Sequence, residues 1–469
     1  MIKKCFVISS IFVSLIVAGC VQSSSEEIHF NELYVATNGD NENSGTIEEP
    51  LLTLEEASER AIKGTKVFIR EGTYYEPLIV QHSGSQSEPI VFQAYQNEQV
   101  HISGGELQDN EEDIELINIV DKSYVTIKGL EVSDLKTDSD EKTVMGILVT
   151  GDSQHIQLLK NHIHHIETHA DEGNAHGIAV YGDEPISNIV IQENTLEDLK
   201  LGWSEALVLN GDVSDFLITE NVIQHNNNIG IDLIGYEGTA HDRSSDFARN
   251  GIISNNTVRH NSSYGNPSYG NNYSAGGIYV DGGSDLLIEG NTVYQNDIGI
   301  EATSEHGGKN ASGIEIIRNT VYENYYTGIS IGGYDDQRGG TSDSLIAENI
   351  LYKNDTKDMD GGQLLFQYNA VDNVIKNNIM TTSDSGIFVN NEYEESIDNT
   401  LTQNVYHKEI NKKQIWIWQG EQVRSLEAFQ DLTGSDEQSI YDDPDFVDAD
   451  HYQFELKDES PANSFHSRR

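Results

Sequence analysis

A short phrase close to Asn-x-aliphatic-x-x-Asn recurs along most of the chain. Its copies fall at intervals between 26 and 35 residues and begin at Asn161, Asn194, Asn221, Asn256, Asn291, Asn319, Asn349, Asn377 and Asn404. A period of this length is typical of stacked-repeat architectures, in which each repeat contacts only its neighbours. The repeat therefore excludes most compact folds and predicts a solenoid.

Short segments within each copy alternate apolar and polar residues. One begins with glycine, as in GIAVYG, GIDLIG, GIYVDG and GISIGG, and another reads FLITEN, LLIEGN or IEIIRN. Alternation over short segments bounded by Gly, Asn and Asp indicates strands. Three strands and three turns per coil predict an all-β fold, a single-stranded right-handed parallel β-helix whose repeated Asn side chains stack as a ladder. A propeller fits less well, because its blades need longer antiparallel hairpins.

Both ends of the chain resemble a known pattern. Residues 34–104 resemble the opening of the pectin-lyase-like superfamily of secreted β-helix proteins, and YDDPDFVDADHYQFELKDESPAN from Tyr441 resembles its closing segment. The resemblance implies a domain over 31–469, with an N-terminal cap over about 31–105 and a closing segment over about 410–469. It also implies a short capping helix near 53–63, which would cover core and strand edges of the first coil. That superfamily contains lyases, hydrolases, epimerases and adhesins, so the fold leaves the chemistry open.

The N-terminus has the pattern of an export signal. A basic start, Lys3 and Lys4, precedes an apolar run that is short for a membrane span. LIVAGC resembles the lipobox of bacterial lipoproteins, which implies a signal peptide over 1–19, lipidation of Cys20 and a tether over 20–30. The protein is then expected outside the cell, anchored on the envelope through lipid alone. An ordinary signal peptide cut elsewhere is the alternative.

The charge of the chain restricts its binding partners, and its cysteine content restricts its disulfides. The chain has 28 Lys and Arg against 78 Asp and Glu, a net charge of −50. Such a surface repels nucleic acid, and it repels polyanionic substrates unless calcium or a basic patch intervenes. Both cysteines, Cys5 and Cys20, lie in the leader, so the mature chain is expected to form no disulfide. We expect a monomer that binds a polysaccharide or oligosaccharide.

Aligning the glycine-led strands places several acids on one outward face. The position two after the glycine gives a first column: Ala179, Val208, Asp232, Tyr279, Glu301, Ser330, Leu365 and Phe388. The position four after it gives a second column: Tyr181, Asn210, Ile234, Asp281, Thr303, Gly332, Gln367 and Asn390. Asp232, Asp281 and Glu301 stand out, because the neighbouring copies carry few other acids. A hydrated surface is the alternative explanation for them.

The spacing of these acids allows two hydrolytic schemes. Asp281 and Glu301 are expected in adjacent coils, with Cα atoms about 8 Å apart. Their carboxyl groups could approach the roughly 5 Å of a retaining glycosidase pair. Asp232 is expected two coils from Glu301, about 9–10 Å away, which is closer to the inverting range. Tyr279 lies between them and is a candidate sugar-binding residue.

Long segments beside this face predict a cleft with binding residues. They follow Asp232, Glu301 and Ser330, and a further insertion rich in Tyr, Asn and Gly precedes Gly277. The candidate substrate-binding residues are Tyr279, Asn210, Tyr236, Glu237, His241, His306, Tyr334, Asp335 and Arg338. The alternative for each is a solvated loop position.

GIYVDG and GIEATSEHG, over about 277–307, resemble the β-xylosidase type of β-helix glycoside hydrolase. The resemblance implies that Asp281 is the nucleophile and Glu301 the acid/base, followed by His306 and Gly307. Val280 and Gly282 stand where that family has an aromatic residue beside its aspartate, so the sugar specificity is not carried over.

Two other functions remain open. A polysaccharide lyase or uronate epimerase would need a base, such as Lys309 or Arg338, and calcium near Asn210 and Asp232. A lipoprotein that only binds glycans or serves a structural role is the third possibility. The histidine-rich run HIHHIETHADEGNAHG has no closed zinc pattern, so we expect no metal site there.

Overall fold

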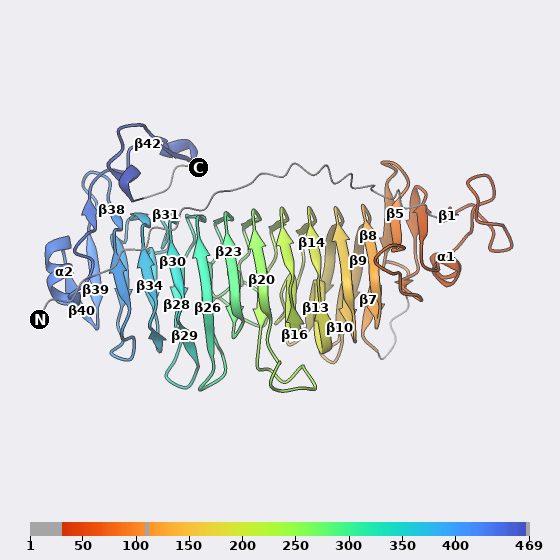
Figure 1. The fold of residues 1–469 in the computed structure, drawn as a ribbon, viewed down its shortest axis with the longest axis horizontal. Coiled ribbons are helices and arrows are strands. Elements are labelled where there is room, and N and C mark those ends of the chain that lie inside the picture. Colours follow the sequence, from red (N-terminus) through yellow and green to blue (C-terminus); the bar gives the residue numbers. More distant parts are fainter. Residues whose placement is uncertain (1–30, 108–111, 466–469) are drawn as a thin grey trace, which may run out of the picture.

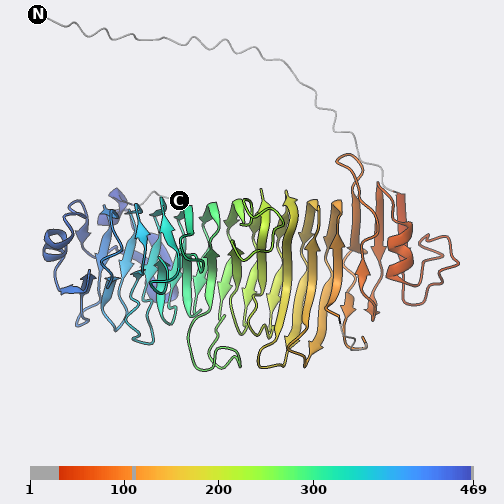
Figure 2. The ribbon, with the colours of Figure 1, turned by 90° about the horizontal axis from the view of Figure 1, so that it is seen from below.

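The computed structural model describes residues 31–107 and 112–465. The predicted signal peptide, Cys20 and the whole of the predicted tether lie outside the described residues, and those expectations stay predictions. The described chain forms one elongated stack of coils that runs from the end with α1 to the end with α2 (Figure 1 and Figure 2). Neither α-helix in these residues is long and apolar enough to cross a membrane.

Parallel strands form three faces, which confirms the predicted parallel β-helix. The first face consists of β4 (Leu78–Ile79), β7 (Ile114–Val120), β10 (Thr143–Thr150), β13 (Asn174–Ser187), β16 (Leu207–Ser214), β19 (Ile231–Ile234), β22 (Gly276–Asp281), β25 (Ile298–Thr303), β28 (Thr327–Ile331), β32 (Leu364–Phe366), β36 (Ile387–Asn391) and β39 (Ile415–Trp418). The second face consists of β1 (Asn31–Val35), β2 (Thr65–Ile69), β5 (Ile90–Ala94), β8 (Ser123–Lys128), β11 (Gln154–Leu159), β14 (Val190–Gln192), β17 (Leu217–Thr219), β20 (Arg249–Ser254), β23 (Ser284–Glu289), β26 (Asn310–Ile317), β29 (Gly340–Ser342), β30 (Leu345–Ala347), β33 (Ala370–Val371), β34 (Val374–Lys376) and β37 (Thr400–Thr402). The third face is a separate 13-stranded sheet of β3 (Gly72–Tyr74), β6 (Val100–Ser103), β9 (Glu131–Thr137), β12 (His162–Thr168), β15 (Thr195–Glu197), β18 (Val222–Gln224), β21 (Thr257–Arg259), β24 (Thr292–Tyr294), β27 (Thr320–Tyr322), β31 (Ile350–Tyr352), β35 (Ile379–Thr381), β38 (Val405–His407) and β41 (Ile440–Tyr441).

Both ends of the stack carry a helix. α1 (Leu54–Arg60) begins at Thr53, whose side chain accepts the Glu56 N–H, and it is shorter than the predicted 53–63. A second helix, α2 (Leu426–Thr433), is absent from the sequence prediction, and its Phe429 stacks on Trp416 at the C-terminal end.

The closing segment turns back over the third face. β40 (Glu421–Val423) pairs antiparallel with β39, and β42 (Phe446–Asp448) pairs antiparallel with β43 (Gln453–Leu456). The 3₁₀ helices Ala449–His451 and Pro461–Ser464 complete it. Phe446 and Phe454 pack with Tyr322 and Tyr352, so this segment shields apolar side chains of the third face.

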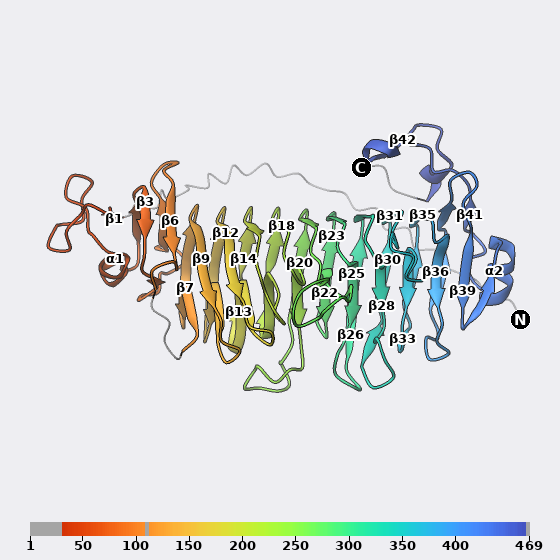
Figure 3. The ribbon, with the colours of Figure 1, turned by 180° about the vertical axis from the view of Figure 1, so that it is seen from behind.

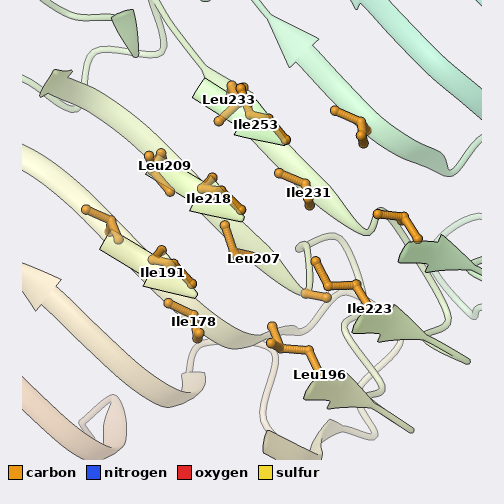
Figure 4. Packing of buried hydrophobic residues seen from close by; sticks show 14 of the residues in the cluster. Ile178, Ile191, Leu196, Leu207, Leu209, Ile218, Ile223, Ile231, Leu233 and Ile253 are labelled. Carbon is orange, nitrogen blue, oxygen red and sulfur yellow. The ribbon is translucent and has the colours of Figure 1, made fainter. Parts of the chain in front are cut away.

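Alternate side chains of all three faces meet inside the coils. Figure 4 shows Ile178, Leu207 and Ile231 of the first face beside Ile191 and Ile218 of the second. Each such aliphatic side chain contributes about 1.5–3 kcal/mol when it is removed from water. Because neighbouring residues point the other way, the polar members of the first face are directed out of the core.

The repeated asparagines form the predicted ladder. Each Nδ2 donates to the Oδ1 of the ladder Asn one coil further on, at 3.0 to 3.2 Å, from Asn161 to Asn404. One position was predicted wrongly, because the ladder residue is Asn378, and Asn377 occupies the preceding turn with φ 57°. A second ladder runs through Asn226, Asn261, Asn296, Asn324 and Asn354 to Gln363.

Asn291→Ala should destabilise the coil stack. The change removes four hydrogen bonds, from the backbone and side chain of Asn256 and to Ile253 O and Asn319 Oδ1. Each buried polar group left without a partner costs about 1–3 kcal/mol, so we expect a loss of about 3 kcal/mol in urea unfolding. Gln157→Ala, an exposed amide on β11, is the control, and equal stability of both variants would contradict the role of the ladder.

Candidate active site

The strands β19, β22 and β25 bring the predicted acids together on the first face. Asp232 pairs with Tyr279, and Tyr279 pairs with Glu301, so these three form one row across adjacent coils. Asp281 pairs with Thr303, which places it diagonally from Glu301. Figure 3 shows β22, β25 and β28 one after another along the stack. The register predicted from the glycines is confirmed for these coils.

The predicted columns fail in the last coil. Leu365 pairs with Asn390, and Phe388 lies buried in the apolar core. Gly386 has φ +79° and the strand register shifts between Ile387 and Val389, so this glycine is a turn residue. Phe388 therefore leaves the first column, and Asn390 takes its place.

The row of acids lines a cleft of about 690 Å³. Its carboxylates are Glu205, Asp232, Glu237, Asp281, Glu301 and Glu305, and its aromatic residues are Trp203, Tyr269, Tyr273, Tyr279, Tyr326, Tyr334 and Tyr393. Among the described residues that line the cleft, none is Lys, Arg or His. Aromatic faces with convergent polar groups are the usual construction of a small-molecule site.

The side chains of these acids point out of the β-helix core. They are nevertheless buried, because loops cover them. Asp232 is 2% exposed, Asp281 4% and Glu301 7%. The longest loops leave the stack at its lower edge in Figure 1, below β20 and β26. The segment 262–275, which carries Tyr269 and Tyr273, forms one wall of the cleft.

Asp297, which is fully buried, holds this wall in place. Its carboxylate accepts five hydrogen bonds of 2.6 to 3.0 Å, from Ser262 and Ser263 at one end of the segment and from Ser274 and Ala275 at the other. A buried carboxylate is stable only with such partners. Both ends of the tyrosine-bearing loop are therefore tied to one residue.

Glu301 lies against two hydrogen-bonding side chains. Gln367 donates to Glu301 Oε1 at 3.0 Å and to Ser330 Oγ at 2.8 Å. Burial raises the pKa of Glu301 to about 7, although the hydrogen bonds from Ser330 and Gln367 act to lower it. A carboxyl group with this pKa can both donate and accept a proton near neutral pH.

Asp281 is held by the loop that follows β25. The backbone N–H of Glu305 donates to Asp281 Oδ1 at 2.6 Å. Burial raises the pKa of Asp281 well above its usual range, the Glu305 carboxylate adds to the rise, and the Glu305 N–H opposes it. Tyr279 and Tyr334 donate to the Glu305 carboxylate at 3.3 and 3.4 Å, which fixes this loop against the cleft.

Asp232 and Glu205 form a second acidic part of the cleft. Asp232 Oδ1 is buried without a hydrogen-bond partner among the described residues. Burial raises the pKa of Asp232 well above its usual range, and the charge of Glu205 adds most to that rise. Burial also raises the pKa of Glu205 to about 8, with a contribution from Glu237.

Of the nine predicted substrate-binding residues, some line the cleft and others do not. Those that line the cleft are Glu237, Tyr279 and Tyr334. Asn210 lies behind this lining and donates to Glu237 Oε2 at 2.8 Å. Tyr236 packs on Phe247, with the Lys309 ammonium 4.8 Å from its ring centroid. Asn210 and Tyr236 therefore lie outside the residues that line the cleft.

The remaining predicted residues lie outside the lining. Arg338 donates to the carbonyl oxygen of Glu305 at 3.0 Å, and Asp335 accepts the Arg338 N–H within the same turn. His241 is exposed and contacts Glu184 at 2.9 Å, away from the acids. His306 lies beside the cleft. The roles assigned to all nine residues stay predictions.

The sequence pattern did not single out several residues of the cleft. Gln367 stands in the predicted second column, but nothing in the sequence marks it as a partner of Glu301. Glu205 precedes β16, and this strand lacks the leading glycine on which the other strands were aligned. The tyrosine-rich insertion was a visible signal, but only the fold shows which of its residues face the acids.

Three side chains in and beside the cleft form a possible cation site. Glu237, Asp281 and His306 each place one ligand atom within 4.8 Å of the others. Calcium takes about six to eight oxygen ligands, and imidazole is not among its preferred donors. Asn210 and Glu305 already donate to the two carboxylates. These residues therefore do not fit the calcium that a lyase would need.

Asp297→Ala should loosen the loop without unfolding the β-helix. The amides of Ser263 and Ala275 lose their acceptor, and that of Ser274 keeps only Ser263 Oγ, so we expect them to exchange hydrogen at least about tenfold faster. Mass spectrometry of exchange would show the change confined to 262–275. Asp152→Ala, at an exposed aspartate outside the cleft, is the control. Unchanged protection of the loop would show that Asp297 does not anchor it.

Comparisons with known proteins agree with this fold. A family model described as Pel9A-like, right handed beta helix region, matches residues 33–266. Among solved structures, the A-module of mannuronan C-5 epimerase AlgE6 from Azotobacter vinelandii aligns with a TM-score of 0.55 at 12% identity, covering 81% of this chain and 91% of that module. GH136 lacto-N-biosidase from Eubacterium ramulus aligns with a TM-score of 0.52 at 15% identity, covering 88% of this chain and 66% of that enzyme's length. At these identities the two likenesses concern the fold.

A relative from Bacillus subtilis strain 168 is far more similar. It is the uncharacterized protein YwoF, which is 54% identical over 439 residues, covering 94% of this chain and 93% of that protein. The chain therefore belongs to the same family as YwoF, and its residues 33–266 match a Pel9A-like right-handed β-helix region.

Proposed function

We propose that the protein is a retaining glycoside hydrolase that acts on glycans outside the cell. The observation that carries this proposal is the diagonal placement of Asp281 and Glu301 in adjacent coils of one cleft. Their Cα atoms are about 8 Å apart by strand spacing and rise. Side chains that lean together from such positions can reach the roughly 5 Å separation of a retaining pair.

Glu301 is proposed as the acid and base. With a pKa of about 7, it holds a proton for the leaving-group oxygen in the first step. After that proton is transferred, the carboxylate can remove a proton from the water that attacks in the second step. Gln367 and Ser330 stabilise this charged form by hydrogen bonding.

Asp281 is proposed as the nucleophile. The 2.6 Å hydrogen bond from the Glu305 N–H orients its carboxylate and favours the ionised form. One oxygen attacks the anomeric carbon, the bond to the leaving group breaks, and a glycosyl ester forms. Tyr279, buried beside Asp281, supplies an aromatic ring and a hydroxyl at this point of the cleft.

The other functions have less support in the cleft. A lyase needs a base that removes a proton beside a uronate, and no described residue of the cleft lining is Lys or Arg. Asp232 and Glu301, two coils apart, retain the spacing of an inverting pair. The stereochemistry of the product decides between these two pairs. We also propose that lipid on Cys20 anchors the enzyme to the cell envelope.

Glu301→Gln and Asp281→Asn should each lower the hydrolysis rate by roughly 10³-fold or more, because each removes a group that changes bonds in the reaction. The assay is a panel of neutral, amino and acidic glycans, scored for new reducing ends and for unsaturated ends. NMR of the first product should show a retained anomeric configuration. Unsaturated ends, inversion or full activity of either variant would contradict the proposed mechanism.

The pH profile should depend on Gln367. Glu301 acts as an acid only when protonated, so activity should be present below about pH 7 and fall as the pH rises through the pKa of Glu301. Gln367→Met removes a donor that stabilises the carboxylate, which raises this pKa further. We expect the alkaline limb to move upward by about one pH unit. Gln192→Met, outside the cleft, should leave the limb in place, and an unmoved limb in Gln367→Met would exclude Glu301 as the acid.

A further inference from the structure

The cleft contains more carboxyl groups than a two-carboxylate mechanism uses. Besides Asp281 and Glu301, four acids line it: Glu205, Asp232, Glu237 and Glu305. Placing like charges in a buried site is costly, because the low dielectric strengthens their repulsion. Surface solubility does not explain acids at these positions, since Asp232 is almost fully buried.

Asp232 lines this cleft and has an unsatisfied acceptor. It lies in the cleft lining, is 2% exposed, and its Oδ1 has no hydrogen-bond partner among the described residues. A buried acceptor left without a donor costs free energy. A ligand that donates a hydrogen bond at this point would recover that energy.

Among the described residues that line the cleft, no Lys, Arg or His stands beside Asp232 and Glu205. His176 Nδ1 lies 3.6 Å from Glu205 Oε2, but burial lowers the pKa of His176 to about 4, so the ring is neutral at neutral pH. The charged groups that act on Asp232 from the surrounding elements are all acids: Glu205, Asp281, Glu237 and Glu305.

Two basic side chains beside the cleft, Arg338 and Lys309, contact other groups. Arg338 lies 3.6 Å from the Glu305 carboxylate and donates to its backbone oxygen. Lys309 lies over the ring of Tyr236, which is outside the cleft lining. Arg338 therefore partly balances Glu305, whereas Asp232 and Glu205 have no basic side chain beside them among the described residues that line the cleft.

We propose that the cleft binds a cationic sugar, an oligosaccharide with a free amino group whose ammonium lies between Asp232 and Glu205. This inference rests on the proposed hydrolase function, because it names the substrate class for the same cleft. An ammonium donates three hydrogen bonds and suits two carboxylates better than a hydroxyl does.

Aromatic residues stand beside this acidic pair. Trp203 and Tyr269 line the same cleft, with ring centroids 5.0 Å apart. Such rings bind sugar faces and also attract a cation. Glu205, which follows Trp203 closely in the chain, brings a carboxylate to the same part of the cleft. A uronate would meet repulsion here, and an N-acetyl group would remove the charge that the acids select.

Calorimetry on Glu301→Gln would test the inference, because this variant should bind substrate without turnover. The probes are oligomers of glucosamine, N-acetylglucosamine and galacturonate of the same length. We expect the glucosamine oligomer to bind at least about tenfold more tightly than the acetylated one, with an affinity that falls as salt rises. Binding should also release protons, measured in buffers of different ionisation enthalpy, because a cation lowers the pKa of raised carboxyl groups.

Asp232→Asn, added to Glu301→Gln, should weaken glucosamine binding by about tenfold or more and reduce the proton release. Glu205→Gln is the second variant should Asp232→Asn not fold, and Asp152→Asn is the matched control that should change neither value. Equal or tighter binding of the acetylated or uronate oligomer would overturn the inference, as would no binding of any oligomer.

The same probes separate this inference from the proposed function. A glucosamine oligomer that binds but is not cleaved by the unaltered enzyme would contradict the hydrolase and support the cation site. Cleavage with retention but without preference for the amino sugar would support the hydrolase and contradict the cation site.

Discussion

Stacked hydrogen bonds along the helix axis fix the position of every coil relative to the next. The asparagine ladder adds to the parallel strand bonds a buried amide that contacts the coils before and after it, as Asn291 does with Asn256 and Asn319. This constraint keeps the strands of the first face in register while loops of different length interrupt them. Acids distant in the sequence, Asp232 and Glu301, therefore reach one row of the same sheet.

The periodic part of this structure can be predicted from the sequence because it depends on local patterns. Residues such as Asn291 and Gly277 recur in successive coils, which makes their positions recognisable in the sequence. Aligning the repeats on these residues is enough to place Asp281 diagonally from Glu301. Two positions mislead the alignment. The residue before each ladder Asn has a left-handed backbone, as Arg318 and Asn377 do, so in the pair Asn377–Asn378 the first fills this turn position and the second joins the ladder. Gly386, with φ +79°, is a turn residue, and Phe388 lies in the core.

The rest of the site depends on long-range contacts that no period encodes. Gln367 lies 66 residues from Glu301 in the chain, yet it donates to its carboxylate at 3.0 Å. Asp297 holds both ends of the insertion before β22, although its sequence neighbourhood resembles that of any other coil. Columns of strand residues predict which acids face outward, whereas only the folded loops determine that these acids are buried.

Two roles in the proposed reaction place opposite demands on the protons of the cleft. Glu301 has to hold a proton, whereas Asp281 has to be ionised, yet burial raises the pKa of both carboxyl groups in the protein alone. An ammonium at Asp232 would lie one coil from Asp281 and two coils from Glu301. Because electrostatic attraction weakens with distance, the cation would lower the pKa of the nucleophile more than that of the acid. A cationic substrate would thus favour the ionisation state that its own cleavage needs, an ionised Asp281 beside a protonated Glu301.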